Sequence, residues 1–243
     1  MSQAAMTGHQ GNSMVQENLT PMDTVNIVRS RMYYLLSLAF SYPGENLLST
    51  QDELYELVAV LYPNLAVSRK DMLVELDKME AEYINVFDGH EQKKYCKPYE
   101  GQWQEADRAM RQWEVKKFYR FFGLGLNRAI NEMPDHIMYE LEFMHYLCYR
   151  MVESASGALG KVKGAGPNQP RHYLQAQKDF LERHLLAWVD DFCRLLQEKT
   201  TLPFYVQLAR VTAQFIVDDM EWLQTQGEEV SKQASGLNGY ANE

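Results

Sequence analysis

Apolar residues recur every three or four positions along most of this chain, which is the spacing of an amphipathic helix. One clear example places Ile137, Leu141, Met144 and Cys148 on a single helical face. No segment shows the strict alternation of apolar and polar residues that is typical of a half-buried strand. The pattern therefore predicts an all-α protein, a single globular domain of six to eight helices.

Capping residues and helix breakers divide this periodic sequence into seven predicted helices. Ser68 to Asp71 resembles a capping box at the start of the third, and Gly123 with Gly125 ends the fourth. Met110, Trp113, Phe118 and Phe121 mark the apolar face of that fourth helix. The predicted ranges are about 23–41, 50–61, 68–87, 104–122, 134–153, 171–198 and 202–224.

Both ends of the chain lack this periodicity. We expect disordered tails at 1–20 and 225–243, on either side of a helical domain at 21–224. Residues 154–170 contain four glycines and two prolines, which predicts a long flexible loop inside the domain. A Gly-Lys pair in this loop has no Ser or Thr after it and follows a helix, so a linker is favoured over a phosphate-binding loop.

Composition narrows the class of protein. The net charge of −9, from 33 acidic and 24 basic residues, argues against phosphate-backbone binding and is compatible with a basic peptide partner. No apolar run approaches the roughly 20 residues of a membrane span, and the N-terminus has no secretory pattern. Three dispersed cysteines form neither a disulfide framework nor a metal pair. We expect a cytoplasmic protein with reduced thiols.

One candidate site lies where the 134–153 helix begins. Pro134 suits a first helical turn, and Asp135 suits the positive end of the helix dipole. His136 and Glu140 are one turn apart and share a face, so they predict a polar face beside a loop, with Glu132 just before it. Such a face is typical of a recognition or catalytic site, and equally of a capped structural helix.

Metal and nucleophile chemistry are weaker interpretations of these residues. His145 lies nine residues after His136 and so on the opposite side of the helix, and no second ligand pair follows. His184, among apolar neighbours, is expected to be a hydrogen-bonded core histidine. Cys148 falls on the apolar face, and Cys96 reads as an incidental surface thiol beside lysines. The residues do not indicate an enzyme.

A second candidate is the segment Pro98-Tyr99-Glu100-Gly101-Gln102-Trp103. It places two aromatic rings and a carboxylate beside a proline at a helix entrance. Tyr and Trp are favoured anchors in peptide binding. The alternative, an entry turn whose rings pack into the core, is equally compatible with the pattern.

Together and in this order, the two segments resemble the TorD/DmsD/NarJ family of redox-enzyme maturation chaperones. The resemblance includes Glu82 to Phe87 before a variable connector, the Pro98-Tyr99-Glu100 turn, and Glu132 to His136 followed by Glu140 to Met144. It covers about residues 23–223. Gly101-Gln102-Trp103 departs from the Ser-x-Tyr of many relatives: it keeps an aromatic residue and loses the hydroxyl.

The resemblance implies a cytoplasmic chaperone without catalytic activity. It would bind the precursor of a molybdopterin-dependent oxidoreductase at its leader or twin-arginine signal, prevent premature Tat export and assist cofactor insertion. It implies no stably bound cofactor, only transient contact with the molybdopterin cofactor during client maturation. A monomer or a domain-swapped dimer is compatible with it, and nucleic acid or membrane insertion is not expected.

Residues of both segments are expected to line the client-binding region. Carboxylates of Glu100, Glu132 and Asp135 would pair with guanidinium groups, and Phe87, Tyr99 and Trp103 would receive apolar side chains. The full set is Phe87, Pro98, Tyr99, Glu100, Trp103, Glu132, Pro134, Asp135, His136 and Glu140. Two alternatives remain open at this point: a helical metalloenzyme using Asp135, His136 and Glu140, and a permanent scaffold subunit of a redox complex.

Overall fold

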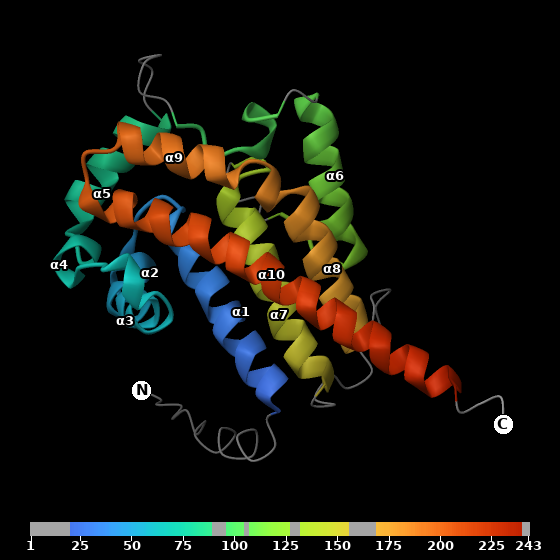
Figure 1. Cartoon of the computed structure of the whole chain (residues 1–243). Coiled ribbons are helices and arrows are strands. Elements are labelled where there is room, and N and C mark those ends of the chain that lie inside the picture. Colours follow the sequence, from blue (N-terminus) through green and yellow to red (C-terminus); the bar gives the residue numbers. More distant parts are fainter. Residues whose placement is uncertain (1–19, 89–95, 105–106, 127–131, 156–168, 240–243) are drawn as a thin grey trace, which may run out of the picture.

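Ten α-helices make up the described part of the chain in the computed structural model, which covers residues 20–88, 96–104, 107–126, 132–155 and 169–239 (Figure 1). They are α1 Pro21–Ala39, α2 Glu45–Leu48, α3 Gln51–Leu61, α4 Arg69–Met72, α5 Leu76–Tyr83, α6 Arg108–Phe121, α7 Ile137–Ala155, α8 Pro170–Arg183, α9 Val189–Lys199 and α10 Pro203–Gly239. The prediction of an all-α protein is confirmed. Eight of these helices have more than seven residues, and the four-residue helices α2 and α4 add to the predicted number.

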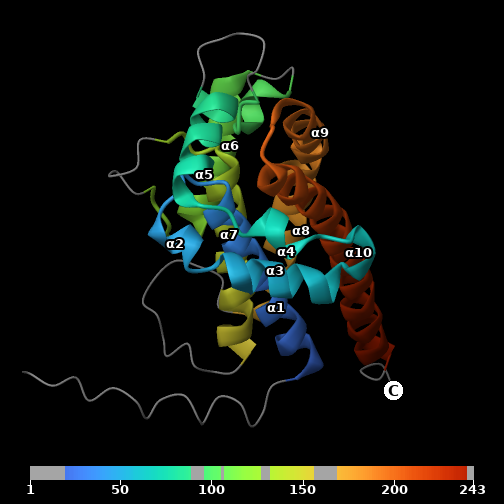
Figure 2. The same ribbon diagram turned by 90° about the vertical axis from the view of Figure 1, so that its left-hand side faces the viewer.

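Helices α1 and α7 form the centre of the molecule and run side by side in both views (Figure 1, Figure 2). Helix α8 packs on α7, and α10 packs on both α8 and α9. The short helices α2 to α4 lie on the opposite side of this centre from α6 (Figure 1). Among the described residues, no helix is long and apolar enough to cross a membrane.

Local signals explain where the helices begin and end. At the start of α1, Asp23 N donates to Thr20 Oγ1 at 3.1 Å and Thr20 N donates to the Asp23 carboxylate at 3.0 Å, which is a capping box. At the end of α6, Gly123 adopts a φ of +74°. Leu124 N then donates to Tyr119 O at 2.9 Å, so the predicted glycine stop is a Schellman motif.

The predicted 68–87 helix is interrupted, because a side chain replaces the backbone partners of one residue. Gln51 Nε2 donates to Val74 O at 3.1 Å, and Val74 N donates to Gln51 Oε1 at 3.3 Å. This tertiary contact separates α4 from α5. A π-helical turn, Ile84–Asp88, then continues α5.

The predicted 171–198 helix also divides in two. Helix α8 ends at Arg183, a 3-10 turn spans Leu185–Ala187, and α9 follows. His184, at the break between the two helices, has φ −116° and ψ −84°, and its ring is hydrogen-bonded to Glu100. Apolar periodicity runs through both segments and therefore did not reveal the break.

The sequence predicted a disordered tail from residue 225, whereas α10 continues to Gly239. The segment is polar but is rich in good helix formers and has no proline, so nothing in the backbone stops the helix. The predicted tail before Thr20 and most of the 154–170 loop lie outside the described residues.

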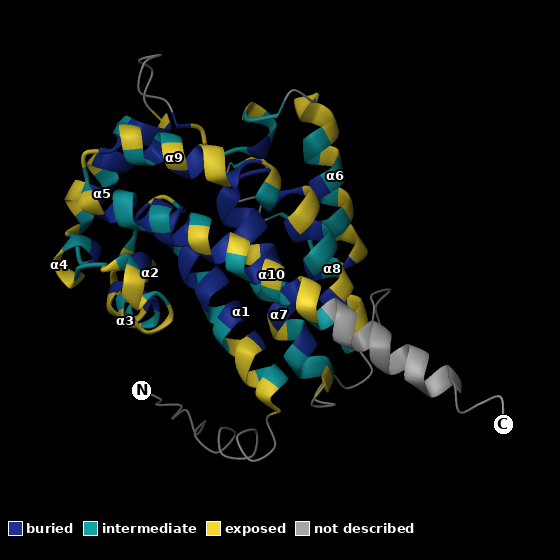
Figure 3. Cartoon of the chain, in the orientation of Figure 1, coloured by how far each residue is buried: buried dark blue, intermediate teal, exposed yellow. Residues whose placement is uncertain are grey.

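The apolar face of α7 is confirmed as the core of the molecule (Figure 3). Ile137, Leu141, Met144 and Cys148 are all fully buried. Cys96 is fully buried too, so the expected surface thiol is wrong. Its Sγ lies 3.5 Å from Phe192 O, and burial raises the pKa of the thiol well above its ordinary value. Such a thiol is poorly reactive.

The apolar face assigned to α6 is largely exposed, which corrects the sequence interpretation (Figure 3). Met110, Trp113 and Phe121 are 52%, 49% and 61% exposed, whereas Val115 and Tyr119 are buried. This helix carries apolar residues on two faces, so spacing alone could not say which one packs inward. Its exposed stripe is a candidate interaction surface.

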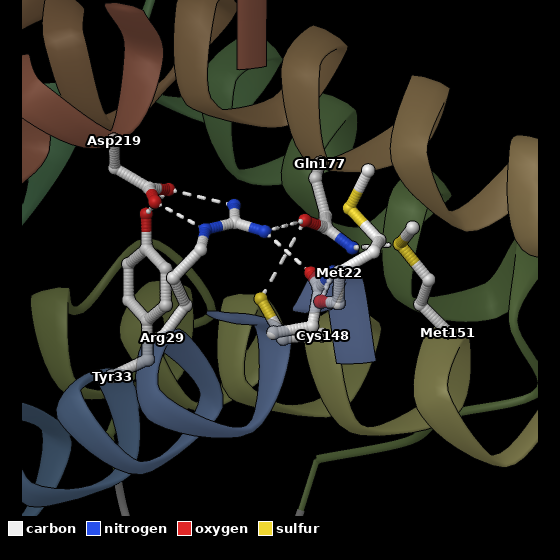
Figure 4. Close-up of polar contacts among 8 residues, drawn as sticks. Met22, Arg29, Tyr33, Cys148, Met151, Gln177 and Asp219 are labelled. Atoms are coloured by element: carbon white, nitrogen blue, oxygen red, sulfur yellow. Dashed lines mark hydrogen bonds and ion pairs between the residues drawn. The ribbon is translucent and has the colours of Figure 1, made fainter. Parts of the chain in front are cut away.

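A buried network of hydrogen bonds around one ion pair connects four of the long helices, α1, α7, α8 and α10 (Figure 4). Arg29 of α1 donates through two nitrogens to Asp219 of α10, with Nη2–Oδ2 at 2.9 Å. Its Nη1 donates to Asn26 at 2.6 Å and to Gln177 of α8 at 2.7 Å. Tyr33 Oη donates to Asp219 at 2.6 Å, and Cys148 of α7 reaches Gln177 (Figure 4).

We predict that Arg29→Met lowers the free energy of unfolding by about 3–5 kcal/mol, because it leaves the buried Asp219 carboxylate without its charge partner. The matched control is Arg69→Met, which removes an exposed pair with Asp52 and should change the free energy of unfolding far less, because water screens exposed pairs. Urea denaturation of both variants measures the difference. Equal losses would show that the buried network is not a cross-link of the fold.

Candidate functional site

The two motif segments meet in an isolated antiparallel β-bridge between Tyr99 and His136. Glu100 N donates to Asp135 O at 2.9 Å, and Ile137 N donates to Pro98 O at 2.9 Å. The Tyr99 and His136 rings also meet edge to face, with centroids 5.0 Å apart. Two loops that are separated in sequence are therefore held together by backbone hydrogen bonds; we call residues 98–101 and 134–137 the junction.

Asp135 strengthens the junction through its side chain. Its Oδ2 accepts from Gly101 N at 3.1 Å. A Cβ at Gly101 would lie 2.7 Å from Arg108 Cγ and 3.1 Å from Asp135 Oδ2. The glycine that departs from the family's Ser-x-Tyr is therefore required here by the close approach of Asp135 and α6. Burial raises the pKa of Asp135, and the Gly101 N–H opposes that rise.

His136 caps α7 instead of belonging to it. Its Nδ1 accepts from Met138 N at 3.1 Å, and its carbonyl accepts from Tyr139 N at 2.9 Å. Burial lowers the pKa of His136 to about 3, so the ring is neutral. The helix begins at Ile137, three residues later than predicted, because the Asp135 carbonyl and the Ile137 N–H take part in the bridge. Pro134 is thus a turn residue, and its carbonyl accepts from Tyr119 Oη at 3.1 Å.

Glu100 connects the junction to the break between α8 and α9. Its Oε2 lies 2.9 Å from His184 Nδ1, and both side chains are fully buried. Its Oε1 accepts from Gln104 Nε2 at 3.0 Å. His184 is thus the hydrogen-bonded core histidine that the sequence predicted. Its bond to Glu100 fixes the bent backbone that ends α8.

Glu140, in the first turn of α7, lies close to Glu100 and Trp188. Its Oε2 accepts from Trp188 Nε1 at 3.2 Å. Burial, followed by repulsion from Glu100, raises the pKa of Glu140 well above its ordinary value. Burial and the nearby Glu100 carboxyl group therefore both favour the protonated form of Glu140.

The polar face predicted at the start of α7 does not face solvent. Asp135, His136 and Glu140 are all buried, which corrects the sequence interpretation. Glu100, Pro98, Pro134 and Phe87 are buried too. Phe87 lies in the core, where its ring is edge-on to Tyr205 at 5.4 Å between centroids. The predicted pairing of Glu100 and Asp135 with client arginines is not available in this conformation.

Three of the ten predicted residues are partly exposed: Tyr99, Trp103 and Glu132. Tyr99 Oη donates to the Glu132 carboxylate. Trp103 Nε1 donates to Lys97 O at 2.8 Å, and its ring stacks on Trp188 at 6.4 Å between centroids. Within the described ranges, no three His, Cys, Asp or Glu side chains are grouped as metal ligands.

Sequence reasoning did not assign a role to Gly101 or Trp188, and it did not identify Glu100 as the partner of His184. Their contacts cross between distant segments, and a single sequence does not reveal such pairs. The exposed aromatic surface of α6 was missed for the reason given above. It borders a groove of about 790 Å³ between α6 and α8, whose lining includes Lys117, Phe118, Phe121 and Arg183.

We predict that Glu140→Gln stabilises the protein at pH 7 by about 1–3 kcal/mol. A carboxyl group whose pKa is raised by folding contributes stability below its unfolded pKa, near 4.5, and loses it as pH rises. Glutamine resembles the protonated acid and avoids that loss.

Urea denaturation between pH 4 and 8 should therefore show a difference between variant and wild type that grows with pH. A constant difference, or a variant that is less stable throughout, would contradict a protonated Glu140.

The chain was compared with known proteins. The model of the "Nitrate reductase delta subunit" family matches residues 48–194. The perchlorate reductase assembly chaperone protein of Dechloromonas aromatica (strain RCB) is 29% identical over 224 residues, covering 86% of this chain and 96% of that protein. The chlorate reductase assembly chaperone protein of Ideonella dechloratans is 36% identical over 126 residues, covering 51% of this chain and 61% of that protein.

A more distant relative carries the family name used above. The chaperone protein TorD of Vibrio cholerae (strain N16961) is 26% identical over 110 residues, covering 45% of this chain and 46% of that protein. The matched family model covers more than half of the chain and includes both junction segments. The chain therefore belongs to the nitrate reductase delta subunit family, the TorD family of redox-enzyme maturation chaperones, whose members are assembly chaperones and not enzymes.

Proposed function

We propose that this protein is a cytoplasmic assembly chaperone that binds the precursor of a molybdopterin-dependent oxyanion reductase at its leader or twin-arginine signal region. It delays Tat export until the cofactor has been inserted. The observation that carries this proposal is the similarity to a perchlorate reductase assembly chaperone over nearly the whole of that protein. Contact with the molybdopterin cofactor is transient and occurs only during client maturation.

The junction acts as a frame for client binding, and its carboxylates do not contact the client directly. Asp135 and Glu100 are buried, and each has one carboxylate oxygen bound within the fold, to Gly101 N and to His184 Nδ1 respectively. Exposing either of them would leave a buried donor unsatisfied, at a cost of about 1–3 kcal/mol. Their role is to fix the loops that carry Tyr99, Trp103 and Glu132.

The client instead contacts the exposed aromatic surface of α6, beside the frame. Helix α6 begins shortly after the 98–103 turn, and its stripe of Met110, Trp113 and Phe121 leads into the α6–α8 groove. The apolar middle of a leader peptide, bound as a helix, suits a groove whose walls include Phe118, Phe121 and Phe122. The acidic net charge of the chain favours the basic start of such a leader.

The alternative of a metalloenzyme finds no support in the geometry. Asp135 binds Gly101 N, His136 Nδ1 caps α7, and Glu140 binds Trp188. Three side chains with separate structural partners do not converge on one ion. A permanent scaffold subunit remains the second candidate; it predicts that the chain stays in the mature reductase, which purification of that enzyme would reveal.

We predict that Gly101→Ala weakens capture of the client precursor at least tenfold, because the added methyl group pushes Asp135 and Arg108 apart and shifts the frame. The matched control is Gly44→Ala, where a Cβ meets nothing within 4 Å; it should stay within twofold of wild type. Affinity is measured between the purified full chain and the co-expressed precursor, with and without its leader.

Equal capture of the leaderless precursor would overturn leader binding. Equal effects of the two glycine variants would overturn the role of the frame. Unchanged cofactor loading of the reductase in cells that lack this chaperone would overturn the proposed function itself.

A further inference from the structure

A second pocket lies on the outer face of α7, directly beside the junction. It has a volume of about 390 Å³, and its walls include Tyr119, Tyr139, Tyr146 and Tyr149. The last three and Glu142 follow the three- and four-residue spacing of one helical face. Tyr119 also donates to the carbonyl of Pro134, so the pocket shares a wall with the frame.

Glu142 is the only acidic residue among the side chains that line this pocket. Burial raises the pKa of its carboxyl group, and the described residues provide no ion-pair partner for it. The nearest arginine on its own helix, Arg150, pairs with Glu153 at 2.9 Å. Burial lowers the pKa of His145, the histidine in the pocket wall, and so favours its neutral form. A partly desolvated carboxylate without a counter-ion gains strongly from a bound cation.

A hydroxyl group in the pocket wall also lacks a partner. Tyr139 is 6% exposed, and its buried Oη has no hydrogen-bond partner among the described residues. Buried hydroxyl groups are almost always hydrogen-bonded. An N–H donor entering the pocket would supply the missing bond, just as it would neutralise Glu142.

We propose that this pocket binds the guanidinium group of an arginine side chain in the client's leader, with Glu142 as the charge partner and the tyrosine rings as stacking walls. A guanidinium group is planar, stacks on aromatic faces and is less strongly hydrated than an ammonium group, so it enters a partly dry aromatic pocket at lower cost. The proposal rests on the leader binding proposed above and assigns one arginine of the leader to a defined place.

The larger α6–α8 groove does not offer the same chemistry. Of its two carboxylates, Glu114 lies 3.1 Å from Arg111 and 3.9 Å from Arg183, and Asp179 accepts from Gln175 Nε2 at 2.8 Å. Its lysine, Lys117, lies 3.2 Å from the centre of the Trp113 ring. That groove carries two cations, Lys117 and Arg183, beside its carboxylates, whereas no lysine or arginine is among the described residues that line the Glu142 pocket.

The experiment titrates N-acetyl-arginine amide into the full-length protein labelled on its tyrosine rings and follows the ring resonances by NMR. We expect shifts of Tyr139, Tyr146 and Tyr149, a Kd at least tenfold weaker in Glu142→Gln, and a weaker Kd in Tyr149→Ala. Glu142 and Tyr149 are exposed on the helix surface, so both variants should fold. N-acetyl-citrulline amide, which has the shape of arginine without its charge, should not bind.

The matched control is Glu114→Gln, which removes a carboxylate that already has cation partners and should leave the Kd unchanged. Equal binding of the citrulline probe, or less than a twofold effect of Glu142→Gln, would overturn the pocket assignment. If the arginine probe fails while wild-type protein still captures the precursor through its leader, this inference falls and the proposed function stands. If the probe binds as expected but no precursor is captured, the proposed function falls and the pocket remains.

Discussion

The β-bridge between Tyr99 and His136 is the contact on which the rest of the site depends. Two backbone hydrogen bonds and the Asp135–Gly101 bond hold together two loops that come from opposite ends of α6. With the loops fixed, His136 caps α7, Glu100 reaches His184 and ends α8, and Tyr119 closes on Pro134. The motif residues thus act first as structural parts, and they position the exposed aromatic residues around them.

This arrangement explains how the acidic side chains of the two motif segments can be buried. A buried carboxylate is costly unless it is hydrogen-bonded or protonated. Asp135 and Glu100 meet the first condition, and the raised pKa of Glu140 favours the second. Such a network allows little adjustment, so it fixes one loop geometry. A bound client would therefore meet a pre-organised surface, and less free energy would be lost to ordering that surface.

Periodicity predicted most of the fold because it reports which face of a helix is buried. The core stripe of α7 was predicted in this way, and the stop after α6 was predicted from its glycines. The breaks at Val74 and His184 were not, because each depends on one side chain from a distant segment, Gln51 or Glu100. The sequence paired the two motifs correctly but could not tell burial from exposure. Polar residues at a loop–helix boundary look alike in either state, and α6 has two apolar faces.

Hydrogen exchange at the amides of Glu100 and Ile137 tests the central claim most directly, since each donates one hydrogen bond of the bridge. If the junction is a rigid frame, both amides should exchange only through large-scale unfolding, as slowly as amides in the middle of α7. Exchange at the rate of a solvent-exposed loop would show that the two motif segments separate readily. That result would contradict an account in which they form one pre-organised frame for the client.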